Sequence, residues 1–256
     1  MIPILSSIPR SGTHYLKSMI SAALGTPPLE KDLSAPDDLL TVVSGTPGDQ
    51  LIYGHFRFSQ HAAILDEKRY PGLRMVLLTR HPFDRLISQI ALTKSLNGPL
   101  PDPGHSPRRL ARDLLLGNWD GRAWSSGYVV QDFAAWHNFL IRDLVTDWCD
   151  NRRCLLVRYE ELITRPVDTL AMVLEFYRNI KPRVELVEIT KGINFRSLSG
   201  GRSPGQLDST LHYRQGIVGE WHGIFLPADL EVLKEKYEAS LSKMAYSVLT
   251  AHPPPK

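Results

Sequence analysis

The fold is decided at the start of the chain by Ile2-Pro3-Ile4-Leu5-Ser6-Ser7-Ile8-Pro9-Arg10-Ser11-Gly12-Thr13-His14-Tyr15-Leu16-Lys17. A short apolar run leads into a turn, and apolar residues then recur at the three-and-four spacing of one helical face. Where a turn joins a buried strand to a helix, backbone N–H groups converge and the helix dipole adds partial positive charge. The stretch therefore predicts a site for a phosphate-type anion, with an ordinary capped turn as the alternative.

The side chains of this turn favour the anion site. Ser11 and Thr13 add hydroxyl donors. Gly12 lets the backbone curl around a ligand, and Arg10 adds a fixed cation. We expect the loop from Arg10 to His14 to bind a ligand of the phosphate type.

The composition is that of a globular protein, with 43% hydrophobic and 22% charged residues among 256. A net charge of +3 suits small anionic ligands, but Lys and Arg do not gather into the stripe of a nucleic-acid-binding protein. No stretch approaches the roughly 18 apolar residues of a membrane span, and no basic leader precedes the first strand. Cys149 and Cys154 lack histidines at metal-like spacing, which favours small buried thiols in a reducing compartment. We expect a cytoplasmic protein with no metal, nucleic-acid partner or membrane span.

Strands and helices alternate along the chain. Apolar runs predict further strands at 50–55, 73–80 and 154–159. Helical patterns separate them, at 37–43, 59–67, 83–95, 107–116, 128–147, 166–178, 183–191 and 227–244. The order predicts an α/β fold of three layers, with a central parallel sheet of about four to five strands flanked by helices. We expect one domain over 1–249, with a flexible insert at about 97–127 and a Pro-rich tail at 250–256.

Unusual polar groups follow three of the expected strands. Arg10–Thr13 follows the first, His55 the second and Arg80 the third. Because the carboxyl ends of parallel strands meet at one edge of the sheet, these groups are expected to converge there. The sequence thus predicts one site rather than three isolated polar residues.

The opening loop differs from that of nucleotide triphosphatases. Their Gly-x4-Gly-Lys-Ser/Thr pattern needs a leading Gly, a Lys and a magnesium ligand elsewhere. Here the leading Gly and the Lys are absent, and no apolar strand ends in an obvious magnesium-binding Asp. Triphosphate chemistry is disfavoured, although another P-loop-type phosphotransferase is kept as an alternative.

Four motifs resemble those of sulfotransferases that use 3′-phosphoadenosine 5′-phosphosulfate (PAPS). They are Pro9-Arg10-Ser11-Gly12-Thr13, Arg80-His81-Pro82-Phe83-Asp84-Arg85-Leu86-Ile87-Ser88, Tyr159-Glu160-Glu161-Leu162 and Arg214-Gln215-Gly216-Ile217-Val218-Gly219-Glu220-Trp221. Any one is moderately specific, but the four stand in the family's order across residues 1 to 245. The resemblance implies a P-loop-nucleotide-hydrolase-like sulfotransferase fold, with PAPS as donor, 3′-phosphoadenosine 5′-phosphate (PAP) as product and no metal.

The resemblance also implies how the donor is bound. The loop Arg10–His14 would cradle the phosphosulfate, with Arg10 near the bridging oxygen where charge builds up as the sulfuryl group leaves. By the same resemblance Arg80 and Ser88 would bind the 3′-phosphate, and the spacing allows this, since the Ser lies two turns into the helix that follows the Arg. The other implied donor-binding residues are Arg214, Gln215 and Gly216 at the same phosphate, and Tyr15, Tyr159 and Phe195 at the adenine. For these three aromatic residues, packing in the core is the alternative.

His55 is the candidate general base, at the position that matches the family's catalytic His. A neutral imidazole, with an unperturbed pKa of about 6.5, can accept the proton of an acceptor hydroxyl as its oxygen attacks sulfur in line. His14 is a rival because it lies in the phosphosulfate loop. Glu30 is a further candidate, since some branches of the family use a carboxylate after the first helix.

The chain departs from the family pattern at several positions. Tyr53 stands where the cytosolic branch has a Lys, two residues before its catalytic His, and Gln215 replaces the Lys of the last motif. These departures keep open a non-catalytic protein that binds adenosine phosphates. The dimer motif after Trp221 is not preserved, so that dimer is not predicted and the oligomeric state stays open.

The resemblance places a lid over the acceptor pocket at residues 97–127. Aromatic residues suit a pocket for a phenol, an alcohol or a natural-product hydroxyl, and the absence of a basic stripe argues against a polyanionic glycan. The candidate pocket residues are Phe56, Phe58, Trp124 and Tyr128. Packing in the core or anchoring of a loop is the alternative for each.

Overall fold

The computed structural model describes residues 1–30, 36–45, 50–97, 106–118, 142–208 and 213–248. The chain forms two compact units. Unit 1 comprises residues 1–80 and 142–201, and unit 2 comprises residues 81–141 and 202–256. Unit 1 contains the sheet, whereas the described part of unit 2 is built from helices and loops.

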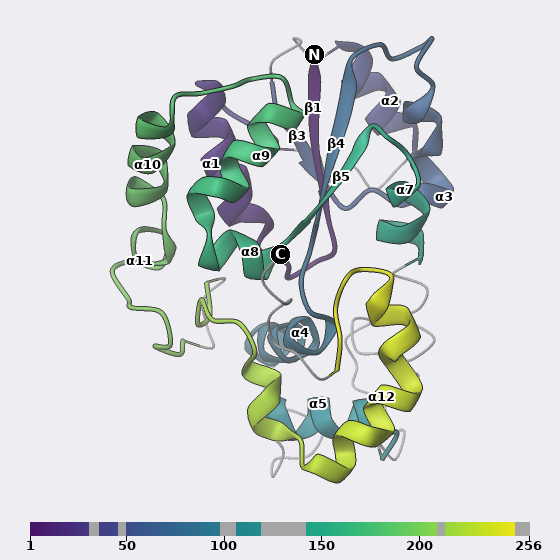
Figure 1. Ribbon diagram of the computed structural model, residues 1–256, viewed down its shortest axis with the longest axis vertical. Coiled ribbons are helices and arrows are strands. Elements are labelled where there is room, and N and C mark those ends of the chain that lie inside the picture. Colours follow the sequence, from purple (N-terminus) through teal and green to yellow (C-terminus); the bar gives the residue numbers. More distant parts are fainter. Residues whose placement is uncertain (31–35, 46–49, 98–105, 119–141, 209–212, 249–256) are drawn as a thin grey trace. The chain divides into compact units, whose positions relative to one another are not determined.

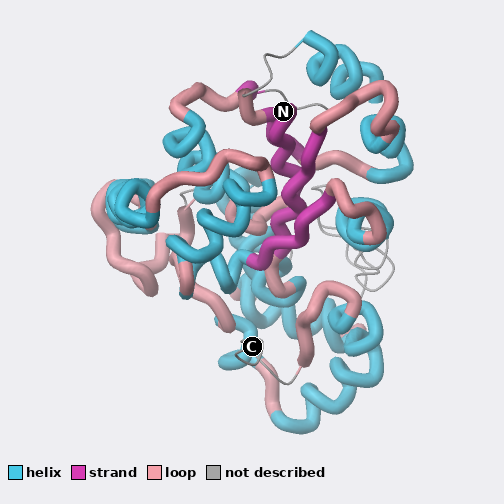
Figure 2. Tube along the Cα trace, turned by 45° about the horizontal axis from the view of Figure 1, so that its top comes forward, coloured by secondary structure: helices cyan, strands magenta, loops and turns pink. Residues whose placement is uncertain are grey.

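The sheet of unit 1 has five parallel strands in the order β2-β3-β1-β4-β5 (Figure 1). Their bounds are β1 (Ile2–Ser7), β2 (Leu29–Glu30), β3 (Ile52–Gly54), β4 (Leu73–Thr79) and β5 (Cys154–Arg158). Ile4 of β1 pairs with Ile52 on one side and with Met75 on the other. The prediction of a central parallel sheet of four to five strands is confirmed, and β1 lies at its centre (Figure 2).

Helices cover both faces of this sheet, so unit 1 has three layers (Figure 1). One face carries α1 (Thr13–Leu24), α8 (Tyr159–Thr164), α9 (Pro166–Phe176) and α10 (Arg183–Gly192), followed by α11 (Phe195–Leu198). The other carries α2 (Pro36–Gly45), α3 (Phe58–His61), η1 (Ala62–Leu65), the π-helix η2 (Arg142–Thr146) and α7 (Asp147–Cys149). Strands covered on both faces read as continuous apolar runs, which is why β4 lacks alternation.

The core on the second face forms where alternate residues of the strands meet α2 and α7. Ile4, Ile52 and Met75 pack there against the completely buried rings of Phe56 and Trp148. The indole Nε1 of Trp148 donates to the backbone oxygen of Phe56 at 3.0 Å, so burial of the ring leaves this polar atom paired. The turn after Gly54 is thereby tied to the core.

Unit 2 is built around one aromatic residue of α4 (Pro82–Asn97). The Phe83 ring contacts those of Trp221, Tyr237 and Phe225, with centroids 5.4, 5.6 and 5.9 Å away. The Asp84 carboxylate accepts from the backbone N–H groups of Gly219 (2.7 Å) and Trp221 (3.0 Å). These contacts hold η3 (Glu220–Ile224) on α4, and α5 (Pro107–Leu116) and α12 (Pro227–Ser242) complete the described part of the unit.

Most helices lie where the sequence predicts them, and the differences concern short elements. β2, α8, α11 and η3 were not expected, and the predicted helix at 59–67 is a short α3 continued by the 3-10 turn η1. The predicted helix at 128–147 and the tail lie largely or wholly outside the described residues, as does most of the insert apart from α5. In the described parts of both units, no helix has the length and apolar character needed to cross a membrane.

Candidate functional site

The turn between β1 and α1 has a strained backbone. Arg10 has a φ of 72° and Gly12 a φ of 90°, both in the left-handed region. Arg10 is one of three non-glycine residues with positive φ in the described chain. Such strain costs about 1–3 kcal/mol and concentrates at functional sites. Arg10 is therefore held in a backbone conformation that arginine disfavours, whereas Gly12 adopts its positive φ without strain.

Position 12 requires glycine for a second reason. A Cβ added to Gly12 would lie 2.5 Å from Cδ2 of Tyr159, the first residue of α8. The Arg80 guanidinium lies over the face of the Tyr159 ring, with Cζ 4.6 Å from the ring centroid, in a cation–π contact. The loop, the end of β4 and the start of α8 thus meet at Tyr159.

Tyr15 belongs to the same cluster. Burial, with a smaller contribution from nearby Tyr159, raises the pKa of Tyr15 to about 12. Its phenol is therefore protonated at neutral pH, where it offers an aromatic surface and a hydroxyl but no charge. The structure brings Tyr15 and Tyr159, which were expected from the motif resemblance, together with Arg80, which was expected at the sheet edge.

His55 directly follows β3 and is exposed. Its Nδ1 lies 2.6 Å from the backbone oxygen of Ser7 and 3.2 Å from the Ser7 hydroxyl. Because a carbonyl oxygen only accepts, Nδ1 carries the hydrogen in this contact. Nε2 of the neutral ring then carries the lone pair, which is the form that a general base needs.

Ser7 connects His55 to the loop. Its hydroxyl lies 2.6 Å from the Thr13 hydroxyl at the start of α1 and 3.2 Å from His55 Nδ1. Sequence reasoning missed Ser7 as a functional residue. Ser7 is the last residue of β1 and lies at the carboxyl edge of the sheet, where the loop begins, and this position is the signal that could have indicated it.

The loop has the features of an anion site. The Ser11 hydroxyl is completely buried and has no hydrogen-bond partner among the described residues. Within that part of the chain no side chain caps the N-terminus of α1, and its first turn contains no acidic residue. Unpaired donors next to the positive end of a helix dipole fit a phosphate or sulfate group.

The remaining predicted donor residues lie in unit 2, apart from His14 of α1 and Phe195, which lie in unit 1. Phe195 is half-buried at the first position of α11 in unit 1. Ser88 is buried on α4. Arg214 makes a bidentate ion pair with the buried Glu220, in which Nη1 and Oε1 are 3.2 Å apart. Gln215 donates from Nε2 to the backbone oxygen of Gly205 at 3.3 Å, and Gly216 has a φ of 65°.

The charge of Glu220 is held by two arginines. Burial alone would raise the pKa of this carboxyl, but the hydrogen bonds and charges of Arg214 and Arg108 outweigh it and lower the pKa. The Arg108 Nε lies 3.1 Å from Oε1 of Glu220. Arg214 is therefore fixed in position by a carboxylate that stays ionised.

The prediction that Phe56 lines the acceptor pocket is corrected by the structure. Its ring is completely buried in the core of unit 1, where it has no surface to offer. Phe58 packs edge-on against Trp148, with ring centroids 5.1 Å apart, and is half-buried. Trp124 and Tyr128 lie outside the described residues. Glu30 ends the edge strand β2, in register with Tyr53.

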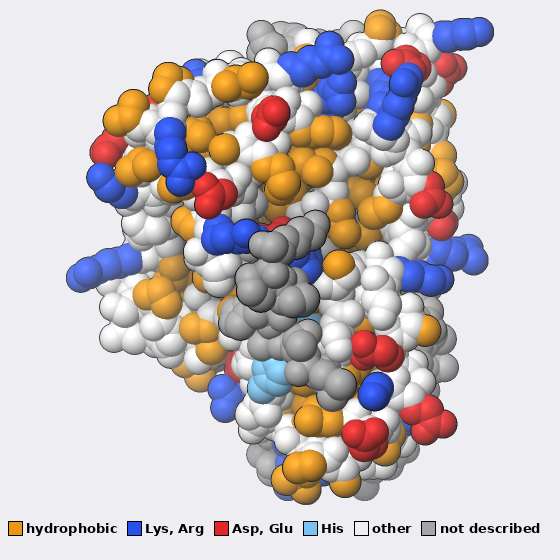
Figure 3. Space-filling view, viewed as in Figure 1, with side chains coloured by type: hydrophobic (Ala, Val, Ile, Leu, Met, Phe, Trp, Pro, Cys, Tyr) orange, Lys and Arg blue, Asp and Glu red, His pale blue; other side chains and the backbone are white. Residues whose placement is uncertain are grey.

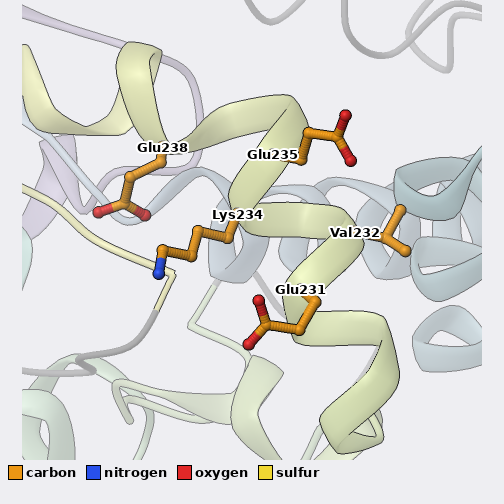
Figure 4. A pocket seen from close by; sticks show the side chains of 5 residues that line it. All are labelled: Glu231, Val232, Lys234, Glu235 and Glu238. Carbon is orange, nitrogen blue, oxygen red and sulfur yellow. The ribbon is translucent and has the colours of Figure 1, made fainter.

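Two other surface features of the described residues do not suggest a competing site. On the face of unit 1 seen in Figure 3, Lys and Arg side chains are interspersed with acidic and apolar ones rather than gathered in a stripe. A depression on α12 is lined by Glu231, Val232, Lys234, Glu235 and Glu238. Their side chains point in different directions around the helix (Figure 4), so they do not converge on a ligand.

A parallel sheet whose central strand feeds a phosphate-type loop defines a protein that binds a phosphorylated ligand at the sheet edge. The chain belongs to the sulfotransferase family, because the model of the "Sulfotransferase domain" matches residues 3–245. Sulfuryl transfer is therefore its reaction class. A comparison with curated proteins gave no match.

Solved structures support the same fold. Mouse sulfotransferase SULT7A1, complexed with PAP, matches with a TM-score of 0.61 and 19% identity over 94% of this chain and 83% of that one. Retinol dehydratase in complex with androsterone and the inactive cofactor PAP matches with a TM-score of 0.59 and 14% identity. That match covers 93% of this chain and 80% of the other. At these identities the likeness concerns the fold.

Proposed function

We propose that this protein transfers a sulfuryl group from PAPS to the hydroxyl of a small-molecule acceptor. The observation that carries the donor assignment is the loop itself, in which the completely buried Ser11 hydroxyl has no partner within the described chain. The two structural neighbours, each crystallised with PAP, support the same donor. PAPS supplies an activated sulfuryl group, and the protein supplies binding, orientation and a base.

The loop is proposed to hold the phosphosulfate. Ser11, Thr13 and the backbone around Gly12 would donate hydrogen bonds, with His14 beside them. The positive end of α1 favours the negative charge. Arg10, fixed in the left-handed conformation, would stabilise the charge that develops on the bridging oxygen. This stabilisation acts only as the bond breaks, so it lowers the barrier rather than merely tightening binding.

The adenosine part of the donor is assigned to the cluster around Tyr159. Tyr15 and Tyr159 would pack against the adenine, and Arg80 would bind the 3′-phosphate. The contact of Arg80 with the Tyr159 ring supports this, because the ring limits the directions in which the guanidinium can point. A planar fork so held suits bidentate binding of a phosphate.

Roles for the other predicted donor residues rest on the motif resemblance. In unit 2, Ser88, Arg214 and the backbone at Gln215 and Gly216 are proposed to bind the 3′-phosphate. The ion pair with Glu220 fixes Arg214 in a defined conformation. Phe195 of unit 1 is proposed as a further contact of the adenine.

His55 is proposed as the general base. The acceptor oxygen forms a bond to sulfur, the acceptor proton passes to Nε2 of His55, and the bond between sulfur and the phosphate oxygen breaks to release PAP. The contact of Nδ1 with the Ser7 carbonyl supports the tautomer that this step requires. His14 is kept as a residue that contacts donor oxygens.

The acceptor is proposed to be a small apolar alcohol or phenol. Retinol dehydratase has been crystallised with androsterone and with retinol, and both fit that description as ligands of that protein. Phe58, Trp124 and Tyr128 are proposed as pocket residues. Phe56 is left out because it belongs to the core.

Two measurements test this function together. Calorimetry should show that PAP binds much more tightly than ATP, because the loop lacks the Lys of triphosphatases and Arg80 recognises the 3′-phosphate. Incubation with radiolabelled PAPS and a mixed panel of phenols and alcohols should then label at least one acceptor. Equal affinity for PAP and ATP would exclude the donor. Tight PAP binding without transfer to any acceptor would favour a non-catalytic binding protein.

A further inference from the structure

Lys17 is a cation beside the loop that none of the roles above uses. It lies on α1 one turn beyond Thr13 and is half-buried. Its Nζ lies 4.3 Å from the centroid of the Tyr53 ring and 3.3 Å from the Tyr53 hydroxyl. The ammonium is thus held by the ring and the hydroxyl of one residue.

The strand register places this contact next to the proposed base. Tyr53 pairs with Leu5 of β1, and side chains alternate along a strand, so Tyr53 and His55 share one face of the sheet with Leu5 and Ser7. Helix α1 covers this face, because Thr13 contacts Ser7 and Lys17 contacts Tyr53. The pair Lys17–Tyr53 therefore lies on the same sheet face as the group formed by Thr13, Ser7 and His55, two residues back along the strands.

The Tyr53 ring connects the Lys17 ammonium to His14 of the loop, because both contact it. Side chains on a helix lean toward the N-terminus of that helix, so a long one covers the turn before its own Cα. For Lys17 that turn begins at Thr13 and His14. The His14 ring also meets Tyr53, edge-on, with centroids 6.4 Å apart. Lys17, His14 and Tyr53 form a small cluster at the start of α1.

The Lys17 ammonium contacts a neutral phenol. Among the side chains that the structure describes, a set that leaves out Glu30 on the neighbouring strand, it makes no ion pair with a carboxylate. A half-buried cation without a counter-ion lowers the energy of an anion that binds beside it. Since the loop at the head of the same helix fits a phosphosulfate, that anion is the donor.

We propose that Lys17 is a further donor-binding residue, whose ammonium contacts the sulfuryl oxygens of PAPS while Tyr53 positions it. The inference rests on the proposed function and assigns the cation at the sulfuryl end of the same site. As the acceptor oxygen bonds to sulfur and the phosphate oxygen leaves, the sulfuryl oxygens keep their negative charge. A cation on them holds the group in line between Arg10 and His55.

The test uses Lys17→Met, which keeps the length of the stem and removes the charge. Turnover with PAPS should fall on the order of 100-fold, the loss typical of one electrostatic contact at a reacting group. PAP affinity should be unchanged, because PAP lacks the sulfuryl group. Lys191→Met is the matched control, since Lys191 is exposed on α10 and pairs only with Glu188 in the described chain.

A second variant separates loss of charge from loss of packing. Lys17→Met combined with Tyr53→Lys puts an ammonium back on the same sheet face as His55, and turnover should recover in part. Tyr53→Phe keeps the ring but removes the hydroxyl contact, so its effect should be smaller than that of Lys17→Met. Circular dichroism and the Tm of each variant show whether it is folded.

The outcomes separate this inference from the proposed function. Wild-type turnover in Lys17→Met would overturn the role of Lys17 while leaving the function intact. An equal loss of PAP affinity and turnover would place Lys17 at the 5′-phosphate and overturn the sulfuryl assignment. Failure of the wild-type protein to bind PAP or to transfer sulfate would overturn the function itself.

Discussion

At the scale of single residues, the site depends on contacts that tie side chains to a strained loop. His55 gains a defined tautomer from the backbone oxygen of Ser7 rather than from a carboxylate. A carbonyl orients the imidazole without adding a full negative charge near an anionic donor. This arrangement suits a base that is proposed to work beside phosphosulfate, because a carboxylate there would repel the substrate.

His55→Ala should abolish sulfation without weakening the donor. Loss of a positioned base costs about 100- to 10,000-fold in rate, whereas PAP makes no use of the base. Radiolabel transfer and PAP calorimetry on the same preparation measure the two effects. His222→Ala is the control, because His222 is an exposed histidine of unit 2. Near-normal turnover in His55→Ala would remove His55 as the base.

Gly12→Ala should destroy donor binding and destabilise unit 1. The new methyl group would overlap the Tyr159 ring and would also require a φ of 90°. Gly25→Ala is a matched control at the other end of α1, with a φ of 69° and no atom within 4 Å of the added Cβ. The control should cost about 1 kcal/mol of backbone strain, measured by urea unfolding, and keep PAP binding. Equal losses in both variants would show that strain alone accounts for the glycine.

The thiols should be unreactive in the folded protein. Burial raises the pKa of Cys149 to about 11 and that of Cys154 to about 12, so little thiolate exists near neutral pH. Labelling with a thiol reagent at pH 7.5 should be slow in buffer and rapid in urea, where both groups are solvated. The structure leaves both cysteines half-buried rather than fully buried as the sequence predicts, so rapid labelling of both in buffer would contradict their raised pKa values.

Residue positions were partly predictable from the sequence. The places of Arg10, Gly12, His55 and Arg80 after the strands were predictable, because parallel strands bring their carboxyl ends together, while their roles stay predictions. Ser7 and Lys17 were missed, since their partners lie across the sheet and only the register reveals them. Phe56 was assigned to the acceptor pocket, whereas it lies in the core. The sequence pattern of an aromatic residue after a strand is the same in both cases.

At the scale of elements, apolar content decided what could be predicted. β4 and β5 are continuous apolar runs, of which β4 is buried and β5 is partly buried, and their positions were predicted to within about one residue. β2 has two residues and therefore no period to detect. η2 is a π-helix, whose spacing a search for 3.6-residue periodicity does not recognise.

The ion pair between Glu220 and Arg214 connects the first residue of η3 to the segment that precedes it. Because its folded-state pKa is lowered, Glu220 contributes stability above its ordinary pKa of 4.5 and loses it as the pH falls. Glu220→Gln should lower the free energy of unfolding by about 3 kcal/mol near pH 7, because Arg214 stays buried without a counter-ion. Urea unfolding between pH 7 and pH 4 measures this.

The pH series also contains its own check. The difference in stability between the wild type and Glu220→Gln should shrink as the pH falls, because the wild type loses the contribution of the carboxylate. Asp168→Asn is a suitable control, as its ion pair with Arg183 is exposed on α9 and should contribute at most about 1 kcal/mol. A difference that stays constant with pH would contradict the lowered pKa of Glu220.

At the scale of the whole molecule, the donor should act as a stabilising ligand. A ligand that binds only the folded state, at 100 times its Kd, adds about 2.7 kcal/mol. For a protein of this size that corresponds to a rise in Tm of about 5–10 °C. PAP should produce such a rise, and adenosine 5′-phosphate at the same concentration should produce a smaller one, because it lacks the 3′-phosphate.

Arg80→Ala turns this shift into a test of the 3′-phosphate site. Measured against its own unliganded Tm, the variant should show a smaller difference between PAP and adenosine 5′-phosphate than the wild type shows, because one of the proposed ligands of the 3′-phosphate is gone. Arg112→Ala removes the bidentate ion pair with Asp229, at 2.9 and 3.0 Å, without touching the proposed donor residues. It should lose stability yet keep the full difference between the two nucleotides. If Arg80→Ala kept that difference too, the 3′-phosphate would have to be bound by other residues, and the loop Arg10–His14 would remain as the part of the site supported in unit 1.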